Sequence, residues 1–427
     1  MFGFLILELF QLFIAIFYFL KKKVKGFPLL SGLEDNCLFC TIIHNFDGMK
    51  LPENLLNKLH VRNSENALRK LPNVSDLIDF ASNDYLGFSQ SESIFNHTHQ
   101  FVIEHKFTQN GATGSRLISG NHSLYQLTED YIAQFHQSDA ALIFNSGYDA
   151  NVGFFGSVPQ KGDLILYDEL CHASIRDGIK LSNAKAYKFT HNDFEELEAL
   201  IQRHKTANIY VVTESVFSMD GDTPNLEELV CVCKKHNCYL VVDEAHALGV
   251  FGDRGEGLVQ MLGLQEEVFA RIMTFGKGLG SHGAAILGSN ELKQYLVNFA
   301  RSFIYTTGMS PHAVATILHA YQFLDTNTNS LDELRSNIVH FNQQKMLLGL
   351  KPMFVQSKSA IQSAIIPGNQ KVKSIAQMFQ ASGFNVKAIL SPTVPEGQER
   401  LRFCLHSYNS KEEISKVLSL LSTFVFQ

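Results

Sequence analysis

The chain has 427 residues, of which 45% are hydrophobic and 18% are charged, and its formal net charge is −6. These values are those of an ordinary globular protein, and they exclude a multi-span membrane protein, a collagen-like repeat and global disorder. The acidic balance also argues against a nucleic-acid partner, because neutralising phosphates requires a basic surface. The length accommodates two or three domains around a sizeable core.

The first 48 residues differ from the rest. Residues 1–20 form an apolar run long enough to cross a bilayer, and three lysines follow it. The positive-inside rule then predicts a single-pass anchor with the catalytic part in the cytoplasm. A secretory signal is disfavoured, because no positive charge precedes the run and no A-x-A-like site follows it. The alternative is an extension outside the working protein, with translation starting at Met49, where a helical pattern begins (KLPENLLNKLH).

Seven cysteines are scattered along the chain, and their odd number predicts reduced thiols in a reducing compartment. Cys37 and Cys40 form a lone C-x-x-C pair, while Cys231, Cys233 and Cys238 lie where a helix leads into a strand. We predict no metal site, because a zinc site needs four ligands at matched spacings.

From Met49 onward, apolar strand patterns alternate with helical patterns. The strand candidates are DLIDFAS, AALIFNS, DLILYD, NIYVVTE, YLVVDE and RIMTFGK. The helical patterns include NLEELVCVCKKHN and SLYQLTEDYIAQF, in which Leu124, Leu127, Tyr131 and Phe135 share one stripe. Nearly continuous apolar strands separated by helices predict an α/β fold with a mostly parallel sheet. In such sheets, ligands bind beyond the carboxyl ends of the strands.

We predict four segments: the apolar leader over residues 1–48, a helix and arm over 49–90, a large domain over 91–305 and a smaller C-terminal α+β domain over 306–427. The last segment contains the strand candidate AIQSAIIP. Its final helix is predicted to begin after Ser410, since Glu413 three residues later completes a capping box.

Two charged residues follow strand candidates of the large domain. Asp243 ends YLVVD, and His246 comes three residues later. Lys277 follows RIMTF and is surrounded by glycines, which let the backbone approach a ligand closely. A buried carboxylate is costly unless a cation or donor meets it. Because a Schiff-base lysine and an acid that pairs with the pyridine nitrogen are the main requirements of pyridoxal 5′-phosphate, we predict this cofactor.

The cofactor also needs a site for its phosphate. Ser146, Gly147 and Tyr148 follow a strand candidate and open a helix, whose free amides can bind an anion. Thr274 can add a hydroxyl from the lysine's strand. The imidazole of His172 follows another strand and could stack on the cofactor ring.

Nine segments resemble one enzyme family over residues 49–427. They are ASNDYLGF, GATGSRLISGNHSLYQLTE, FNSGYDAN, DELCHASIRDG, TESVFSMDGD, VVDEAHALGVFG, TFGKGLGSHGA, IYTTGMSP and PTVPEGQERLRF. Together they resemble the α-oxoamine synthases, pyridoxal-phosphate enzymes of the aspartate-aminotransferase-like fold (fold type I). The resemblance implies the condensation of an amino acid with an acyl thioester and the release of CO2.

The resemblance also implies roles for particular residues. Lys277, Asp243 and His172 would be catalytic, and Glu214 would be a further acid behind them. The residues expected to bind the cofactor are Gly147, Tyr148, His172, Ser218, Asp243, His246, Thr274, Lys277, Thr306 and Thr307. One of the last two threonines is expected to reach the phosphate of a second subunit, which implies a homodimer. The residues expected on the substrate side are Arg69, Asn83, His172, Thr393 and Arg402.

The segments GSRLISGNHSLY and PTVPEGQERLR most resemble members that join L-alanine to a pimeloyl thioester in biotin biosynthesis. The acyl carrier, coenzyme A or a carrier protein, stays open. Thr113 stands where glycine is common in the family. The alternatives are members that use glycine with an acetyl thioester or serine with a palmitoyl thioester. A further alternative of another class is a catalytically silent, membrane-tethered partner subunit.

Overall fold

The computed structural model describes residues 51–69, 71, 76–204 and 208–426, and the chain divides into two units after Arg69. In the first unit, α3 (Glu53–Ser64) begins directly after Pro52, a residue that a helix tolerates at its start because no backbone donor is needed there. No helix within these ranges is long and apolar enough to cross a membrane. The predicted anchor, the choice of Met49 as a start, and the Cys37–Cys40 pair lie outside the described residues.

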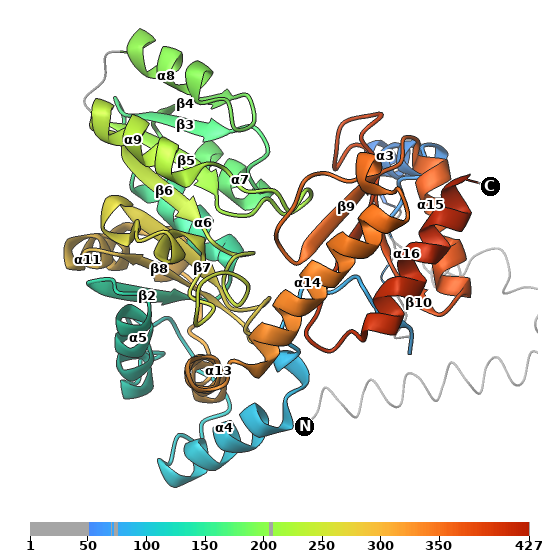
Figure 1. The fold of residues 1–427 in the computed structure, drawn as a ribbon. Coiled ribbons are helices and arrows are strands. Elements are labelled where there is room, and N and C mark those ends of the chain that lie inside the picture. Colours follow the sequence, from blue (N-terminus) through green and yellow to red (C-terminus); the bar gives the residue numbers. More distant parts are fainter. Residues whose placement is uncertain (1–50, 70, 72–75, 205–207, 427) are drawn as a thin grey trace, which may run out of the picture. The chain divides into compact units, whose positions relative to one another are not determined.

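The centre of the second unit is a seven-stranded sheet in the order β2-β8-β7-β6-β5-β3-β4 (Figure 1). Among these strands, only β8 runs against the others. The strands are β2 (Ala140–Phe144), β3 (Leu164–Asp168), β4 (Lys185–Phe189), β5 (Ile209–Glu214), β6 (Tyr239–Asp243), β7 (Ala270–Thr274) and β8 (Ala284–Gly288). The central strands are buried on both faces, which confirms the mostly parallel sheet predicted from their apolar sequences.

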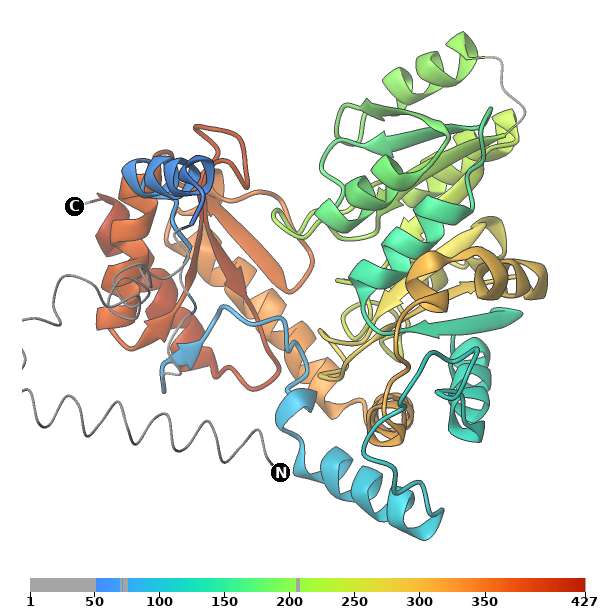
Figure 2. The ribbon, with the colours of Figure 1, turned by 180° about the vertical axis from the view of Figure 1, so that it is seen from behind.

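Two hydrophobic cores lie on opposite faces of this sheet, since neighbouring residues of β2 alternate between them. Figures 1 and 2 show the helices around the sheet from two sides. One core contains side chains of α6 (Gly147–Ser157), α7 (Ala173–Leu181), α11 (Asn290–Phe299) and α12 (Arg301–Ile304). The other contains side chains of α4 (Glu92–Glu104), α5 (Ser123–Phe135), α8 (Phe194–Arg203), α9 (Leu226–His236), α10 (Leu258–Met261) and α13 (Pro311–Thr326).

The C-terminal part has its own antiparallel sheet, in the order β11-β12-β9. Its elements are α14 (Asn329–Leu347), β9 (Ile361–Ile365), α15 (Asn369–Ala381), β10 (Phe384–Asn385), β11 (Lys387–Ile389), β12 (Arg400–Cys404) and α16 (Lys411–Phe426). Short 3-10 helices are η2 (Phe88–Gln90), η3 (Gln265–Glu267) and η4 (Lys351–Met353). The capping box is present: the Glu413 amide donates to Ser410 Oγ at 3.1 Å, and the Ser410 amide donates to Glu413 Oε2 at 2.8 Å.

Three local predictions differ from the structure. DLIDFAS contributes only β1 (Ile78–Asp79), which pairs with β10, because Asp79 Oδ1 accepts two following amides and bends the chain. Leu127 is 50% exposed, whereas Tyr125, outside the predicted stripe, is 1% exposed. The buried face of α5 is therefore rotated towards Tyr125 and away from Leu127. The sequence patterns also missed β4, β8 and β12. β4 and β12 each contain two charged residues, whereas β8 is apolar and was not singled out. The predicted domain boundaries at residues 90 and 305 stay predictions.

Candidate cofactor and substrate site

The site lies where three parallel strands end side by side. Glu214 at the end of β5 pairs in register with Asp243 at the end of β6, and β7 ends next to them at Thr274. Lys277 follows three residues later in the glycine-rich turn. Parallel strands present their carboxyl ends at one edge, so side chains far apart in sequence meet there.

Lys277 is half-buried, and its Nζ lies 2.7 Å from His246 Nε2. Burial lowers the pKa of Lys277 to about 8, although the charges of Asp243 and Glu214 oppose that shift. No carboxylate of the described residues forms an ion pair with this amine within 4.0 Å. A lysine whose pKa lies near neutrality is partly unprotonated, and an unprotonated amine is what nucleophilic or base chemistry requires.

His246 connects the lysine to a residue that the sequence patterns did not single out. Its Nδ1 lies 2.6 Å from the hydroxyl of Tyr85, which donates to Asn83 Oδ1 at 3.2 Å. Burial and the neighbouring Lys277 charge hold the pKa of His246 well below its usual value, so the ring is neutral. The chain of contacts is consistent if Lys277 donates to Nε2 and the Nδ1–H donates to Tyr85. Tyr85 lies in the segment ASNDYLGF, two residues after Asn83. Its place in that family-like segment could have identified it as a site residue from the sequence.

The two carboxylates of the site have different surroundings. Asp243 Oδ2 accepts from Asn151 Nδ2 at 2.9 Å and Oδ1 from the Ala245 amide at 2.9 Å, so each of its oxygens meets a neutral donor. No cation within the described ranges lies within ion-pair distance of Asp243. Glu214 accepts the backbone N–H of His172. Burial and Asp243 raise the pKa of Glu214 to about 8, so this carboxyl holds a proton near neutral pH.

His172 precedes α7 and acts as its N-cap. Its Nδ1 accepts the Ser174 amide at 3.2 Å and contacts the Ser174 hydroxyl at 2.7 Å. Ser174 Oγ in turn accepts from Asn151, the residue that holds Asp243. The imidazole itself is exposed, and its orientation is therefore set by the helix start rather than by burial.

The start of α6 carries the residues that were predicted to hold the phosphate. Ser146 Oγ caps the Asp149 amide at 3.0 Å, and within the described part of the chain the amides of Gly147 and Tyr148 have no acceptor. A Cβ at Gly147 would lie 2.5 Å from Thr274 Oγ1, so only glycine lets this threonine lie against the helix start. Free amides at a helix N-terminus beside a hydroxyl suit a phosphate.

The two threonines expected near the phosphate differ. Asn145 Nδ2 donates to the Thr306 hydroxyl at 3.1 Å and to the Thr307 backbone carbonyl at 2.7 Å. The Thr306 hydroxyl is therefore held within its own chain. The exposed Thr307 hydroxyl has no partner among the described residues.

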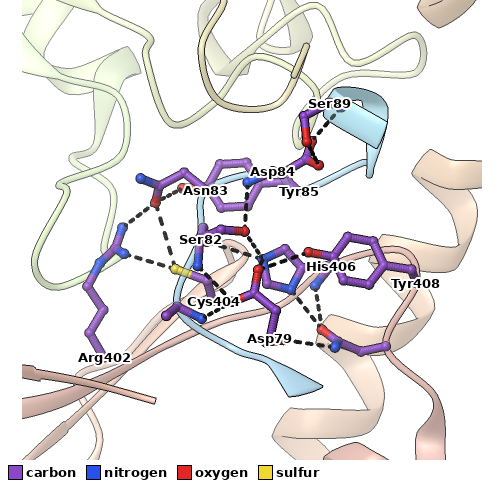
Figure 3. A network of polar contacts seen from close by, with 12 residues as sticks. Asp79, Ser82, Asn83, Asp84, Tyr85, Ser89, Arg402, Cys404, His406 and Tyr408 are labelled. Carbon is purple, nitrogen blue, oxygen red and sulfur yellow. Dashed lines mark hydrogen bonds and ion pairs between the residues drawn. The ribbon is translucent and has the colours of Figure 1, made fainter. Parts of the chain in front are cut away.

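Arg402 on β12 brings the C-terminal sheet to this site. Its guanidinium donates to the Ser218 carbonyl at 2.7 Å. It also donates to Asn83 Oδ1 at 3.0 Å and to Cys404 Sγ at 2.9 Å (Figure 3). Asn83 thus receives hydrogen bonds from both Tyr85 and Arg402. An arginine held in this way can present its planar fork to a carboxylate.

A polar network holds the 79–89 segment that carries Asn83 and Tyr85 (Figure 3). His406 Nε2 lies 3.1 Å from the Ser82 hydroxyl, and its Nδ1 lies 3.0 Å from Asn409 Oδ1. Asp79 accepts the amides of residues 81 and 82. Since His406 is fully buried, this network fixes the backbone on which Asn83 stands.

Two further residues were predicted on the substrate side. Thr393 is exposed in a turn where its amide donates to the Leu390 carbonyl at 2.8 Å, and none of the contacts described above involves it. Arg69 is exposed and belongs to the first unit. Their assigned roles stay predictions, as do those of the clustered residues.

The residues present fit pyridoxal phosphate in three respects. Asp243 is a 5% exposed carboxylate with two neutral donors and unused acceptor capacity, which a cationic ring nitrogen can satisfy. Lys277 supplies an amine of lowered pKa. The amides of Gly147 and Tyr148, which have no acceptor among the described residues, suit an anion. No group of three metal-ligating side chains occurs in the described ranges.

Comparison with known proteins gives consistent results. Residues 75–421 match the family model described as aminotransferase class I and II. A curated protein of Emericella nidulans, named 8-amino-7-oxononanoate synthase, is 40% identical over 403 residues, which cover 88% of this chain and 96% of the relative. A solved 8-amino-7-oxononanoate synthase of Francisella tularensis has a TM-score of 0.70 at 28% identity, covering 82% of this chain and 98% of that one. The serine palmitoyltransferase of Sphingomonas wittichii has a TM-score of 0.79 at 26% identity, covering 87% and 96%.

The fold and the strand-end lysine and aspartate therefore define an enzyme of the aminotransferase-like fold, which confirms the predicted fold class. The chain belongs to the class I and II aminotransferase family and, within it, to the α-oxoamine synthases. The resemblance seen in the nine sequence segments is thereby confirmed.

Proposed function

We propose that this chain joins L-alanine to a pimeloyl thioester and releases CO2 and the free thiol, forming 8-amino-7-oxononanoate in biotin biosynthesis. The observation that carries the proposal is the convergence of Lys277, His246, Asp243 and the Asn83–Arg402 pair at one strand edge. The relatives that cover most of the chain carry the name of that activity. The enzyme is a pyridoxal-phosphate-dependent acyltransferase.

When bound, pyridoxal phosphate withdraws electrons from the amino acid, so that its Cα proton can be removed. The amides of Gly147 and Tyr148, with the Thr274 hydroxyl, would hold the phosphate. Asp243 would face the ring nitrogen and keep it protonated, because a buried carboxylate favours a cation beside it. His172 would cover the ring, and the hydroxyl of Ser218 would contact its phenolic side together with His246.

Lys277 and Arg402 would act on the amino acid. The Arg402 guanidinium, fixed by Ser218 and Asn83, would bind the carboxylate and orient the Cα–H bond. Lys277 Nζ would remove the Cα proton and later return one to the product, which its pKa of about 8 permits. His246 would accept a hydrogen bond from that amine and keep it in place.

A second candidate is a serine and palmitoyl thioester condensation. It is favoured by the TM-score of 0.79 with the serine palmitoyltransferase of Sphingomonas wittichii, which exceeds that of 0.70 with the Francisella tularensis synthase. The sequence identities favour the first candidate, since they are 40% with the Emericella nidulans 8-amino-7-oxononanoate synthase and 26% with the serine palmitoyltransferase. The remaining alternative within the family is the condensation of glycine with an acetyl thioester.

The partners follow from the same proposal. The acyl substrate would be a thioester of coenzyme A or of a carrier protein. Two copies of the chain would form a homodimer. The exposed Thr307 hydroxyl, which has no partner among the residues that the structure describes, supports this and would reach the other copy's phosphate. A cytoplasmic location is supported by five free cysteines among the described residues, Cys171, Cys231, Cys233, Cys238 and Cys404.

The experiment is a substrate matrix with the purified full-length chain. Alanine, glycine and serine are each paired with pimeloyl, acetyl and palmitoyl thioesters, and thiol and CO2 release are measured. We expect the highest kcat/KM for alanine with the pimeloyl thioester. A preference for serine with the palmitoyl thioester would overturn the proposal. Absence of turnover with every pair, together with absence of a visible absorbance band from lysine-bound cofactor, would instead support the silent partner subunit.

A further inference from the structure

The turn of residues 217–222 follows β5 and carries Ser218. It closes on itself, because the Phe217 amide donates to the Asp222 carbonyl at 3.0 Å and the Gly221 amide donates to the Phe217 carbonyl at 2.7 Å. Gly221 has φ +77°, and a Cβ there would lie 2.3 Å from the Ile361 carbonyl oxygen. The turn is therefore rigid and seated directly on β9.

Consecutive residues of this turn bind the C-terminal sheet. The Ser218 carbonyl accepts from Arg402 Nε, and the Met219 carbonyl accepts from Ser363 Oγ at 2.6 Å. The Gly221 carbonyl accepts from the hydroxyls of two further serines, Ser357 at 2.7 Å and Ser359 at 2.9 Å. The remaining contact is an ion pair between Asp220 and Arg400. The turn thus connects the end of β5 to β9 and β12.

The Asp220–Arg400 pair is the charged contact in this set that the reaction itself does not require. The two side chains are 14% and 5% exposed, so solvent screens the pair only weakly. Arg400 and Arg402 are two residues apart on β12 and therefore point to the same face of the strand. Arg400 binds the turn two residues after Ser218, the residue whose carbonyl orients Arg402.

We propose that Asp220 and Arg400 are positioning residues for the amino-acid substrate. The pair holds the turn so that the Ser218 carbonyl keeps Arg402 Nε engaged. The two outer guanidinium nitrogens contact Asn83 and Cys404, and each has a second N–H for the substrate carboxylate. The inference rests on the proposed function only in taking Arg402 as the carboxylate-binding residue. It predicts that the pair acts on amino-acid binding and not on thioester or cofactor binding.

The test uses Asp220→Asn and Arg400→Met in the holoenzyme, with Arg400→Lys and Asp220→Glu as conservative variants. We expect Asp220→Asn and Arg400→Met to raise the KM of the amino acid at least about 10-fold, as for a disturbed charge-assisted hydrogen bond. The KM of the thioester and the cofactor affinity, measured by absorbance titration, should change less than about 2-fold. Arg400→Lys and Asp220→Glu should recover most of the loss, since each restores the charge.

A matched control is the exposed pair of Lys188 and Glu169, whose side chains are 65% and 33% exposed. Lys188→Met should leave all three constants unchanged. A crystal structure of Asp220→Asn should show Arg402 Nε detached from the Ser218 carbonyl. Equal losses in both KM values, in cofactor affinity and in melting temperature, without rescue by the conservative variants, would overturn the proposal.

The assay uses whichever amino acid the unaltered chain condenses best. A preference for serine or glycine would therefore contradict the proposed alanine specificity and leave this test intact. An unchanged amino-acid KM in both Asp220→Asn and Arg400→Met would overturn the positioning role even if alanine is confirmed. If Arg400→Met does not fold, Asp220→Asn and Arg400→Lys still decide the outcome.

Discussion

Two clusters with acidic side chains lie along the same carboxyl edge of the large sheet, and they differ in ion pairing and in the pKa values of their members. At the ends of β5 and β6, Glu214 and Asp243 stand beside Lys277 without an ion pair within 4.0 Å among the described residues. At the end of β3, Asp168 is bridged to Asp222 by His191, whose ring nitrogens lie 2.9 Å and 2.8 Å from the two carboxylates.

The consequences appear in the pKa values. Burial lowers the pKa of His191, but the hydrogen bonds and charges of Asp168 and Asp222 raise it to about 10. In the other cluster burial dominates, and the pKa values of Glu214 and Lys277 both shift to about 8. One strand edge therefore holds His191, which stays charged at neutral pH, and also Glu214 and Lys277, whose pKa values lie near neutrality. The difference lies in whether each charge has an oppositely charged partner within hydrogen-bond distance.

The largest effect is expected from Lys277→Ala. Removing the amine takes away both the cofactor attachment and the base, so kcat should fall at least about 10⁴-fold, the upper range for a general base. The visible absorbance of lysine-bound cofactor should vanish with it. Lys188→Ala, which removes an exposed lysine, is the control and should leave both unchanged. Retained turnover in Lys277→Ala would refute the assignment.

A smaller loss is expected from His246→Leu. This substitution removes the hydrogen bonds to Lys277 and Tyr85 and leaves cofactor attachment possible, so kcat should fall about 10²-fold while the absorbance band remains. Tyr85→Phe keeps the imidazole and should cost less than His246→Leu. Steady-state kinetics of the two variants test this prediction. A larger loss of kcat in Tyr85→Phe than in His246→Leu would contradict it.

His191→Gln should affect stability rather than catalysis. It leaves the buried Asp168 and the partly buried Asp222 without their cation, so the free energy of unfolding should fall by roughly 3 kcal/mol. A histidine whose folded pKa of about 10 exceeds its ordinary 6.5 stabilises fully below pH 6.5, and the contribution disappears as the pH rises towards 10. Urea unfolding at pH 6 and 9 should show the difference from the unaltered chain shrinking. If the difference in unfolding free energy does not change with pH, His191 does not stabilise the protein through its charge.

The smallest effect is expected from Glu214→Gln. The folded pKa of about 8 lies above the ordinary 4.5, so the folded state holds an extra proton in that window and loses stability as the pH rises through it. Glutamine keeps a carbonyl for the His172 amide and cannot ionise. In the cofactor-free protein, the slope of unfolding free energy between pH 5.5 and 7.5 should become more positive by up to about 1.4 kcal/mol per pH unit, the value for one proton. An unchanged slope would show that Glu214 is already ionised.

Much of the large sheet was predictable because its strands carry their own signal. β2, β3, β5, β6 and β7 are short apolar runs, and Asp243 and Lys277 follow two of them directly. The helix boundaries of α5 and α16 followed from periodicity and a capping box. β12 was not found as a strand, because alternating arginines hide its apolar side. Leu401 and Phe403 lie in the hydrophobic core, while Arg400 and Arg402 contact the turn of residues 217–222.

Sequence by itself determined five of the seven strands of the large sheet, the strand-end position of the lysine and the aspartate, and through nine segments the family. Only the tertiary structure decided which charges meet. Asn83 and Arg402 are 319 residues apart, Tyr85 and His246 are 161 apart, and Asp220 and Arg400 are 180 apart. Residue type sets what a side chain can do, but its pKa and orientation depend on neighbours and burial, which the chain acquires only when its distant segments pack together.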